Sequence, residues 1–369
     1  MGVVPRRVIL EECVMQKGKV ATAGSKMLQN FVAPFDAEIV ARLLASEYEI
    51  IGRSEMAEFA FESMFSSGAE TLSTAVEFVA NGEAEFAICN DIFGKQRQQA
   101  AENGLCYIRP SYGTVSRHGL IQSVCSMDQL GIVCKDLTEG FELLSIIAGR
   151  DSKDGAMHPE EQYNYSAHSK KMRIGVPWLG SNESGSEFEL VAMDLQHYEV
   201  YKQIFYILAC AELANNINRY DGVKFGYRAP EHRGINELYV KSRTQAFGLD
   251  VKLAAIMGSY VLSRDQYTPL YEKAMKLRRV IKESLRFDKY DVILLPASYC
   301  DELDNNLALY ALAPLAGLPS ISFDGGDIGS RLINRLFPNA GAGMQLLANV
   351  CCENDLLTAW KAVQLCNMK

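Results

Sequence analysis

The sequence predicts an α/β protein in which helices and strands alternate along the chain. Three observations indicate this class: apolar residues recur at helical spacing in several segments, short apolar runs of strand length follow them, and glycine or proline marks the boundaries. The chain has 369 residues, of which 48% are hydrophobic and 22% are charged, so it can bury a large core. One large domain fits this length, and two modest domains would also fit it.

Capping residues define the elements of the first half. Asp36 is a candidate N-cap for the first helical pattern, and Gly82 and Gly149 stand where the next two helical patterns end. The expected helices of this half span residues 37–46, 71–81 and 137–148. The expected strands, which are short apolar runs, span residues 48–51 and 84–89.

The second half repeats the alternation with longer helices. A strand over residues 173–177 begins it, and two long helices are expected over residues 198–218 and 267–287. A further strand over residues 292–295 is expected to stop at Pro296, which cannot donate a backbone N–H group to a sheet. The alternation therefore predicts a layered fold in which helices pack on a sheet.

Charge and hydropathy argue against several classes of protein. The net charge of −8 and the isoelectric point near 5.3 are unfavourable for a protein that coats nucleic acid, so no direct nucleic-acid binding is expected. The sequence contains no run of eighteen apolar residues, and its first residues lack the long apolar core of a signal peptide. We therefore expect a cytoplasmic protein without membrane association.

The ten cysteines lack the regular spacing of a disulfide framework or a zinc site. Cys134 and Cys210 lie in apolar surroundings, where a free thiol behaves as a small hydrophobic group, and this suggests a reducing compartment. The adjacent Cys351 and Cys352 have no second cysteine pair and no nearby histidines. No metal is therefore expected.

Five blocks of sequence occur in the order found in a known family. The first spans residues 22–60 and begins TAGSKMLQNF. The later blocks are RPSYGTVSRHGLIQSVCSMDQLG from Arg109, RYDGVKFGYRA from Arg219, FGLDVKLAAIMGSYVLS from Phe247 and LAGLPSISF from Leu315. Through these blocks the sequence resembles the amidase signature family, and within it the A subunits of glutamyl-tRNA(Gln)/aspartyl-tRNA(Asn) amidotransferases. The resemblance implies one amidase-signature domain over residues 1–369, with a mixed central sheet flanked by helices on both faces, trimmed at the N-terminus and in surface loops.

The resemblance also implies where the family's catalytic residues would lie, and all three are replaced. The family's lysine base corresponds to Glu11, its bridging serine to Thr71 and its nucleophilic serine to Lys95. One glycine of the family's oxyanion-hole loop has become phenylalanine, whose side chain is expected to obstruct close approach of a substrate to the backbone. The residues at the oxyanion-hole positions are Ile92, Phe93 and Gly94.

These replacements lead to three hypotheses for the site. The first is a charge-swapped ion pair between Glu11 and Lys95, with Thr71 between them, in which the carboxylate keeps the amine protonated and unable to act as a base. The second is an active Thr71 nucleophile that a desolvated, neutral Lys95 activates. The third is that Glu11 and Lys95 both point to solvent from a loop, as most charged residues do.

The residues that bind the substrate in the family offer a second comparison with this sequence. By resemblance, the family's arginine that holds the substrate carboxylate from a long helix corresponds to Arg278. The family's aspartate that holds the substrate amino group has no counterpart, because residues 305–314 contain no acidic side chain. Arg278 is also open to interpretation as one member of a basic, solvated helix face. The other members of that face are Lys273, Lys276, Arg279, Lys282 and Arg286.

The glycine-rich stretch over residues 325–343 does not predict a nucleotide site. It lacks the order of strand, G-x-G-x-x-G and helix that would bring glycines to a pyrophosphate. By resemblance, this stretch is expected to be the loop that follows the LAGLPSISF block. No cofactor is expected.

The sequence therefore supports two classes of function. The favoured one is an amidase-like protein without catalysis, acting as a scaffold or regulatory subunit, with the B and C subunits of a tRNA-dependent amidotransferase as the partners that the resemblance implies. The alternative is an active amidase or glutaminase that supplies ammonia for transamidation and uses Thr71 with Lys95.

Overall fold

The computed structural model of the chain describes residues 5–62, 72–298, 303–324, 326–338, 340–341 and 343–366. Its strands are β1 (Arg6–Glu11), β2 (Tyr48–Ser54), β3 (Phe86–Asn90), β4 (Cys106–Arg109), β5 (Leu130–Cys134), β6 (Met172–Pro177), β7 (Glu183–Ser184), β8 (Phe188–Met193), β9 (Val292–Pro296), β10 (Ser320–Phe323) and β11 (Met344–Ala348). Its helices are α1 (Glu38–Leu44), α2 (Thr74–Ala80), α3 (Lys95–Glu102), α4 (Leu137–Ile147), α5 (Tyr201–Asn216), α6 (Gly234–Ala246), α7 (Leu249–Val261), α8 (Lys273–Ser284), α9 (Leu303–Ala316), α10 (Gly326–Leu336) and α11 (Glu353–Cys366).

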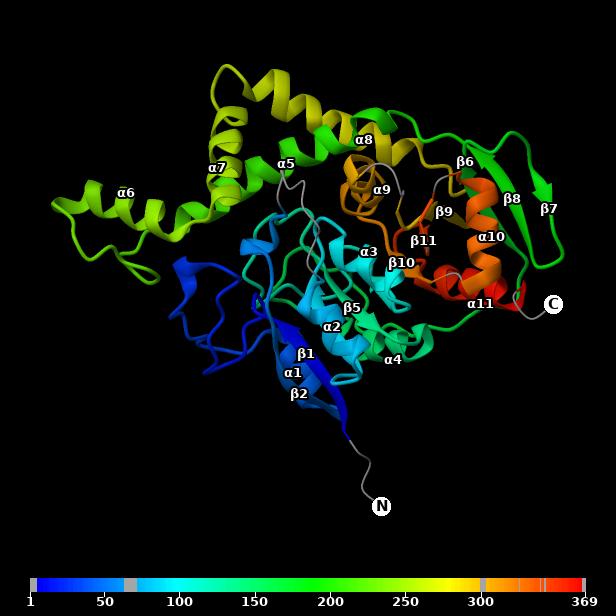
Figure 1. Cartoon of the computed structure of the whole chain (residues 1–369), viewed down its shortest axis with the longest axis horizontal. Coiled ribbons are helices and arrows are strands. Elements are labelled where there is room, and N and C mark those ends of the chain that lie inside the picture. Colours follow the sequence, from blue (N-terminus) through cyan, green and yellow to red (C-terminus); the bar gives the residue numbers. More distant parts are fainter. Residues whose placement is uncertain are drawn as a thin grey trace.

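The strands of the described residues form one mixed sheet in the order β2-β1-β3-β5-β4-β10-β11-β9-β6-β8-β7 (Figure 1). Strands β2, β1 and β3 are parallel to one another, and so are β9, β6 and β8. The strands between these two groups pair in antiparallel fashion, from β3 through β5, β4, β10 and β11 to β9. The expected mixed α/β sheet is therefore confirmed.

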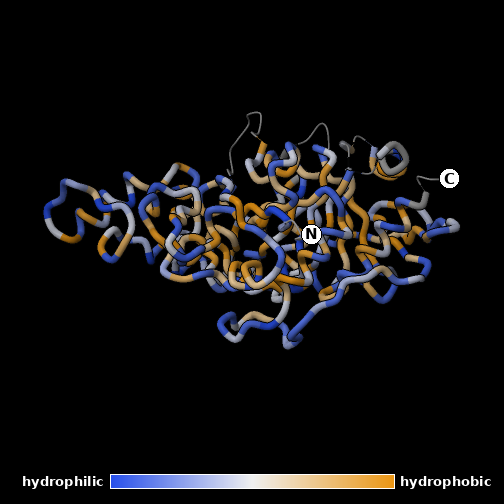
Figure 2. The backbone as a smooth tube through the Cα atoms, turned by 90° about the horizontal axis from the view of Figure 1, so that it is seen from below, coloured by the Kyte–Doolittle hydropathy of each residue, from blue (hydrophilic) through white to orange (hydrophobic). Residues whose placement is uncertain are grey.

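Alternating side chains place two apolar layers on the two faces of the sheet. Ile9 of β1 and Val133 of β5 belong to the layer that α2 and α3 cover, whereas their neighbours Val8 and Ile132 belong to the layer that α1 and α4 cover. Successive residues of a strand point to opposite faces, so a strand buried on both faces is apolar throughout. Figure 2 shows the resulting concentration of apolar segments along the middle of the molecule.

The expected elements are recovered with shifts of a few residues at their ends. The expected helix over residues 37–46 is α1, and Asp136 accepts a hydrogen bond from the Glu139 N–H group as the N-cap of α4. The expected helix over residues 267–287 begins as a wider turn, Tyr267–Glu272, before α8. One expectation is wrong: the glycine-rich stretch is not a continuous loop, because α10 occupies most of its first half.

Helices α5 and α7 pack closely because a glycine lies at their contact. Gly258 of α7 faces α5, and a Cβ atom at this position would lie 2.0 Å from the backbone oxygen of Cys210 and 2.6 Å from Cβ of Ala214. Figure 1 shows α6 and α7 at the end of the molecule remote from α11, with α6 reaching farthest from the sheet.

Replacement of Gly258 by alanine should separate α5 from α7. The free energy of unfolding, measured by urea denaturation, should fall by about 1–3 kcal/mol, because backbone atoms cannot yield to the added methyl group without a shift of the helix. Gly180→Ala is the matched control, since its added Cβ atom meets nothing within 4 Å. An equal effect of the two substitutions would contradict the close packing of α5 and α7.

Candidate functional site

The carboxyl ends of two neighbouring strands and the start of a helix define the candidate site. Glu11 is the last residue of β1, and Asn90 is the last residue of β3. Because these strands are parallel neighbours, their ends meet at one edge of the sheet. The chain then turns through residues 91–94 into α3, whose first residue is Lys95. The family positions predicted from the sequence therefore converge here, apart from Thr71, which lies outside the described residues.

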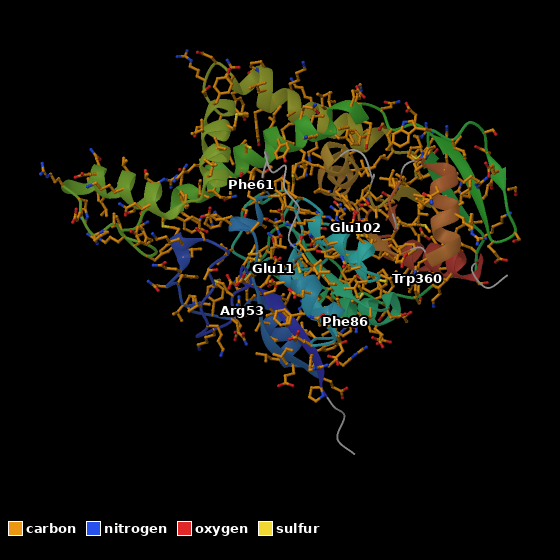
Figure 3. The ribbon with its side chains drawn as sticks, viewed as in Figure 1. Glu11, Arg53, Phe61, Phe86, Glu102 and Trp360 are labelled. Carbon is orange, nitrogen blue, oxygen red and sulfur yellow. The ribbon has the colours of Figure 1, made fainter. Side chains whose placement is uncertain are left out.

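Glu11, labelled in Figure 3 at the end of β1, is completely buried, and both of its carboxylate oxygens accept hydrogen bonds. Oε2 accepts the backbone N–H of Asn90 at 2.8 Å, and Oε1 accepts the side-chain amide of Gln96 at 3.0 Å. The Cys13 thiol also lies 3.7 Å from Oε2. The guanidinium of Arg53 donates to the backbone oxygen of Glu11 at 3.3 Å rather than to its carboxylate. The hypothesis that Glu11 points to solvent is therefore wrong.

Burial favours the protonated form of Glu11. Loss of hydration raises the pKa of its carboxyl to about 8, against the opposing effect of the hydrogen bonds from Asn90, Cys13 and Gln96. The nearby Glu62 carboxylate adds a smaller upward effect. The neutral carboxylic acid therefore predominates at neutral pH, and a neutral acid cannot accept a proton from a neighbouring hydroxyl group.

The expected ion pair between Glu11 and Lys95 is not formed in the described structure. Lys95 Nζ instead lies 3.8 Å from Oε2 of Glu62, and the two side chains are 22% and 23% exposed. The physical reason is that Gln96, the next residue of α3, provides the hydrogen bond that Glu11 Oε1 accepts. The Glu11 carboxyl group thus contacts Gln96, whereas the Lys95 amine contacts Glu62. The hypothesis that Lys95 faces solvent from a loop is also wrong, since Lys95 begins a helix.

The loop over residues 92–94, which the sequence predicts to hold the oxyanion-hole positions, is enclosed by aromatic side chains. Ile92 and Phe93 are buried, and the Phe93 ring has its centroid 5.0 Å from both the Phe61 and Phe205 rings. Gly94 has a φ angle of +83°, and a Cβ atom there would lie 2.6 Å from the Tyr310 side chain. Phe93 thus packs into an aromatic cluster, where it fills space that a glycine would leave open.

Asn90 extends the polar contacts of Glu11 to a second buried carboxyl group. Its side-chain amide donates to Asp128 Oδ1 at 2.9 Å, and its side-chain oxygen accepts the backbone N–H of Gln129 at 3.2 Å. Asp128 Oδ2 accepts the backbone N–H groups of Ser123 and Val124 at 3.0 and 3.1 Å. Burial raises the pKa of Asp128 against these hydrogen bonds. The edge of the sheet therefore holds two buried carboxyl groups joined through one asparagine.

Behind the loop lies a buried ion-pair cluster that the sequence did not point to. Asp91 Oδ2 lies 2.8 Å from Nε of Arg97 and 3.4 Å from Nη1 of Arg109, and all three side chains are at most 1% exposed. Arg109 also donates to the backbone oxygens of Asp91 and Met127. Buried charges are stable only when they are paired, so this cluster of opposite charges fixes the start of the 91–97 segment.

Arg97 connects this cluster to the second half of the chain. Its Nη1 donates to Gln345 Oε1 of β11 at 2.9 Å, and its Nη2 donates to the backbone oxygen of Tyr310 in α9 at 3.0 Å. The guanidinium carbon also lies 4.8 Å from the centre of the Tyr310 ring. The segment that carries Lys95 is thus anchored on both halves of the sheet.

Arg278 is held by the protein itself. Its Nε donates to the Leu315 oxygen at 2.7 Å, Nη1 to Ser126 Oγ at 2.7 Å, and Nη2 to the oxygens of Ser126 and Pro314 at 3.0 and 3.2 Å. The interpretation as part of a solvated face is therefore wrong for Arg278, whereas the other five basic residues of that face are exposed. Each nitrogen of the guanidinium already has a partner within the chain.

Sequence reasoning missed the residues that complete these contacts. Asp91 directly follows a buried strand, and Arg109 ends the apolar run CYIR. Charged residues next to apolar strands were therefore the signal that could have indicated buried ion pairs. No comparable signal identified Gln96 or Glu62, since polar residues at a helix start or in a loop are ordinary. The partner of each charge is decided by three-dimensional proximity, which one sequence does not reveal.

No group of three or more histidine, cysteine, aspartate or glutamate side chains that could hold a metal ion occurs among the residues described. None of the helices traced in the structure is both long enough and apolar enough to cross a membrane.

Comparison with known proteins identifies the family. The family model described as Amidase matches residues 7–71, 75–187 and 182–357, so the chain belongs to the amidase family. The A subunit of the glutamyl-tRNA(Gln) amidotransferase of Acinetobacter baumannii (strain AYE) is 33% identical over 393 residues, covering 93% of this chain and 78% of the relative. The protein of the same name from Lachnospira eligens is 32% identical over 406 residues, with 96% and 82% covered.

The fold is also similar to the folds of solved structures. The crystal structure of the glutamyl-tRNA(Gln) amidotransferase A subunit from Thermotoga maritima superimposes with a TM-score of 0.70 at 23% identity, covering 96% of this chain and 81% of that one. A further crystal structure, described as that of an amidase, superimposes with a TM-score of 0.70 at 16% identity. The resemblance inferred from the sequence blocks is therefore confirmed for family and fold.

Removal of the Asp91 carboxylate should destabilise the protein severely. The Asp91→Asn variant would leave two buried arginines without their counterion, so the free energy of unfolding should fall by about 3–5 kcal/mol in urea denaturation. Asp288→Asn is the matched control, because Asp288 pairs with Arg286 at an exposed site and its replacement should leave stability unchanged. Equal stability of the two variants would contradict the central role of the cluster.

Glu11 should make the protein less stable as the pH rises. Its pKa is near 8 when folded and near 4.5 when unfolded, so its stabilising protonated form is fully present below pH 4.5 and is lost towards pH 8. The free energy of unfolding should decline by at most about 1.4 kcal/mol per pH unit inside this window. Urea denaturation between pH 5 and 8 measures the decline, and the neutral Glu11→Gln variant should make its slope smaller.

The control for this titration is Glu85→Gln. Burial acts to raise the pKa of Glu85, but hydrogen bonds from Arg7 outweigh burial and lower it, so Glu85 stays ionised across this pH range. Glu85→Gln should therefore retain the wild-type slope. A slope that Glu11→Gln leaves unchanged would show that Glu11 does not carry the effect.

Proposed function

We propose that this member of the amidase family acts without amide-bond chemistry, as a scaffold or regulatory subunit. The observation that carries the proposal is the burial of the Glu11 carboxyl group, which the sequence resemblance assigns to the position of the family's lysine base. Its two oxygens are occupied by Asn90 and Gln96, and burial keeps it protonated at neutral pH. A protonated carboxyl group cannot replace a base that must take a proton from a bridging hydroxyl group.

Two further replacements support the same conclusion. Lys95, at the position of the nucleophilic serine, is engaged with the Glu62 carboxylate, and an ammonium group is not a nucleophile. Phe93, at an oxyanion-hole position, is buried among Phe61, Phe205 and Tyr206. Stabilisation of an oxyanion requires donors that a substrate can approach closely, and an enclosed loop disfavours that approach.

The proposed partners follow from the relatives. Those relatives are named as the A subunit of a glutamyl-tRNA(Gln) amidotransferase, so we propose B- and C-type subunits of such an enzyme as partners of this chain. Arg278 supports a structural role, because each of its guanidinium nitrogens already donates to Leu315, Pro314 or Ser126. Binding of a substrate carboxylate would have to compete with those internal hydrogen bonds.

The purified chain should release no ammonia from glutamine or from a simple primary amide. We expect rates equal to the buffer background, because the described base and nucleophile positions hold a neutral acid and a paired ammonium group. A coupled ammonia assay measures this, with wild type compared with Thr71→Ala and Lys95→Ala. All three proteins should give the same background rate.

The assay is repeated after co-expression with B- and C-type subunits, so that dependence on a partner does not conceal activity. A relative that retains serine and lysine at the family positions provides the positive control. Co-purification with those subunits without turnover agrees with the scaffold. Ammonia release that disappears in Thr71→Ala and Lys95→Ala would instead establish the alternative, a threonine-lysine amidase.

A further inference from the structure

Two loops that lie next to helix α6 pack against each other and form one surface (Figure 1). The loops span residues 17–32 and 223–228. The Tyr227 N–H group donates to the Met27 oxygen at 2.7 Å. The centroid of the Phe225 ring lies 5.8 Å from that of the Phe31 ring. These contacts hold the loops together, and we call the surface that they form the basic-apolar surface.

The surface exposes apolar side chains from both loops. In the first loop, Val20 is 43% exposed and Val32 is 52% exposed. In the second loop, Val223 is 42% exposed and Phe225 is 38% exposed. Val20 and Val32 pair across an antiparallel β-bridge, so their side chains lie on the same side of the first loop. Single exposed apolar residues are ordinary, whereas neighbouring ones mark places where another molecule binds.

The same two loops carry positive charge that no acidic residue within them balances. Residues 13–35 contain three lysines and no aspartate or glutamate, and residues 222–230 contain one lysine, one arginine and no acidic residue. The whole chain has a net charge of −8, so the charge of this surface is opposite to that of the protein as a whole. The cationic side chains, all of them exposed, are Lys17, Lys19, Lys26, Lys224 and Arg228.

Two acidic residues next to the loops are engaged by backbone N–H groups. Asp36 Oδ1 accepts the N–H group of Lys17 at 2.7 Å. Asp221 Oδ1 accepts the N–H groups of residues 223 and 224 at 2.8 and 3.3 Å. Within the described part of the chain, none of the five cationic side chains belongs to an ion pair. Their charge is therefore available to an anionic group of another molecule.

The exposed apolar side chains of the neighbouring helices are not accompanied by charge of one sign. In α6, Glu237 pairs with Lys241 at 2.8 Å beside the exposed Val240. In α7, Asp250 and Lys252 lie two residues apart. Charges of both signs select no particular partner. Of these three surfaces, the basic-apolar surface alone combines exposed apolar groups with an excess of positive charge.

The rings of the basic-apolar surface are already packed, which disfavours a nucleic acid as its ligand. Base stacking needs an open ring face. The Phe225 ring contacts the rings of Phe31 and Tyr220, whose centroids lie 5.8 and 6.1 Å away. Lys26 Nζ lies 4.4 Å from the centre of the Tyr227 ring. The acidic remainder of the chain would also repel a long polyanion, whereas a protein segment needs only apolar contacts and a few carboxylates.

We propose that the basic-apolar surface binds a segment of a partner protein in which apolar side chains are flanked by aspartate or glutamate. The apolar side chains of the segment cover Val20, Val32 and Phe225, and its carboxylates pair with the lysines of the two loops. This arrangement has the apolar centre and polar rim of a protein interface. The carboxylates also make the affinity fall as the salt concentration rises. The proposal concerns binding alone, so it holds whether or not the chain has catalytic activity.

Fluorescence anisotropy of a labelled synthetic peptide that repeats Glu-Glu-Leu-Leu, titrated with the full chain, tests the proposal. The peptide should bind with a Kd of about 10–100 μM, and the Kd should rise about fivefold or more when the salt concentration is raised from about 0.05 to about 0.5 M. A peptide that repeats Lys-Lys-Leu-Leu should not bind. The double variant Lys19→Glu with Lys224→Glu reverses charge in both loops and should raise the Kd about tenfold or more.

The matched control is the double variant Lys276→Glu with Lys282→Glu. It makes the same change of charge at exposed lysines of α8, away from the two loops in Figure 1, and should leave the Kd within about twofold of the wild-type value. Val32→Asn removes an apolar contact without changing the charge and should raise the Kd about threefold or more. Circular dichroism confirms that each variant is folded.

Three results would overturn the proposal. The first is that the wild type shows no saturable binding of the acidic peptide, or that Lys19→Glu with Lys224→Glu leaves the Kd unchanged. The second is that the α8 control variant weakens binding as much as the loop variant does, because net charge alone would then govern the affinity. The third is that a single-stranded RNA oligonucleotide binds more tightly than the peptide and is lost in the loop variant, which would assign the surface to nucleic acid.

Discussion

The buried contact of Asp91 with two arginines is the constraint on which the centre of this molecule depends. Arg97 and Arg109 share this carboxylate without exposure to water, and their Nη atoms donate to β11, α9 and the backbone near β5. A buried charge that lost its partner would be costly, so the three residues must fold together. They therefore fix the position of the 91–97 segment relative to both halves of the sheet.

The chemistry of the candidate site follows from that fixed segment. Gln96 donates to the Glu11 carboxyl group, whereas the side chain of Lys95 reaches Glu62 instead. The carboxyl group has hydrogen-bond partners but no paired cation among the described residues, so burial determines its protonation state. The family's fold is thus retained, while Glu11 and Lys95, the two ionisable groups predicted to lie at its catalytic positions, are placed in separate environments.

Much of the fold was accessible from the sequence because its signals are local. Apolar periodicity predicted α1, α4 and α5, and five sequence blocks predicted the family and its mixed sheet. The stretch after β10 was misjudged, because its glycines suggested a loop although Arg331, Leu332 and Arg335 follow in a helical segment. Glycine lowers the stability of a helix without forbidding it, and neighbouring residues decided the outcome.

The site was less predictable, since its pairings join residues far apart in the chain. The sequence located Glu11 and Lys95 but could not show that Gln96 and Glu62 compete for them. The sequence also gave no measure of burial. Burial keeps Glu11 uncharged, and it places Arg278 where its guanidinium donates hydrogen bonds to the protein backbone.

A carbon-13 NMR titration of the Glu11 side-chain carboxyl carbon, assigned by its absence in Glu11→Gln, tests the central claim most directly. The buried, uncharged Glu11 described above predicts a titration midpoint near pH 8, with the protonated form predominant at neutral pH. A midpoint near the ordinary glutamate value would show that Glu11 is an ionised carboxylate at neutral pH and would contradict that claim.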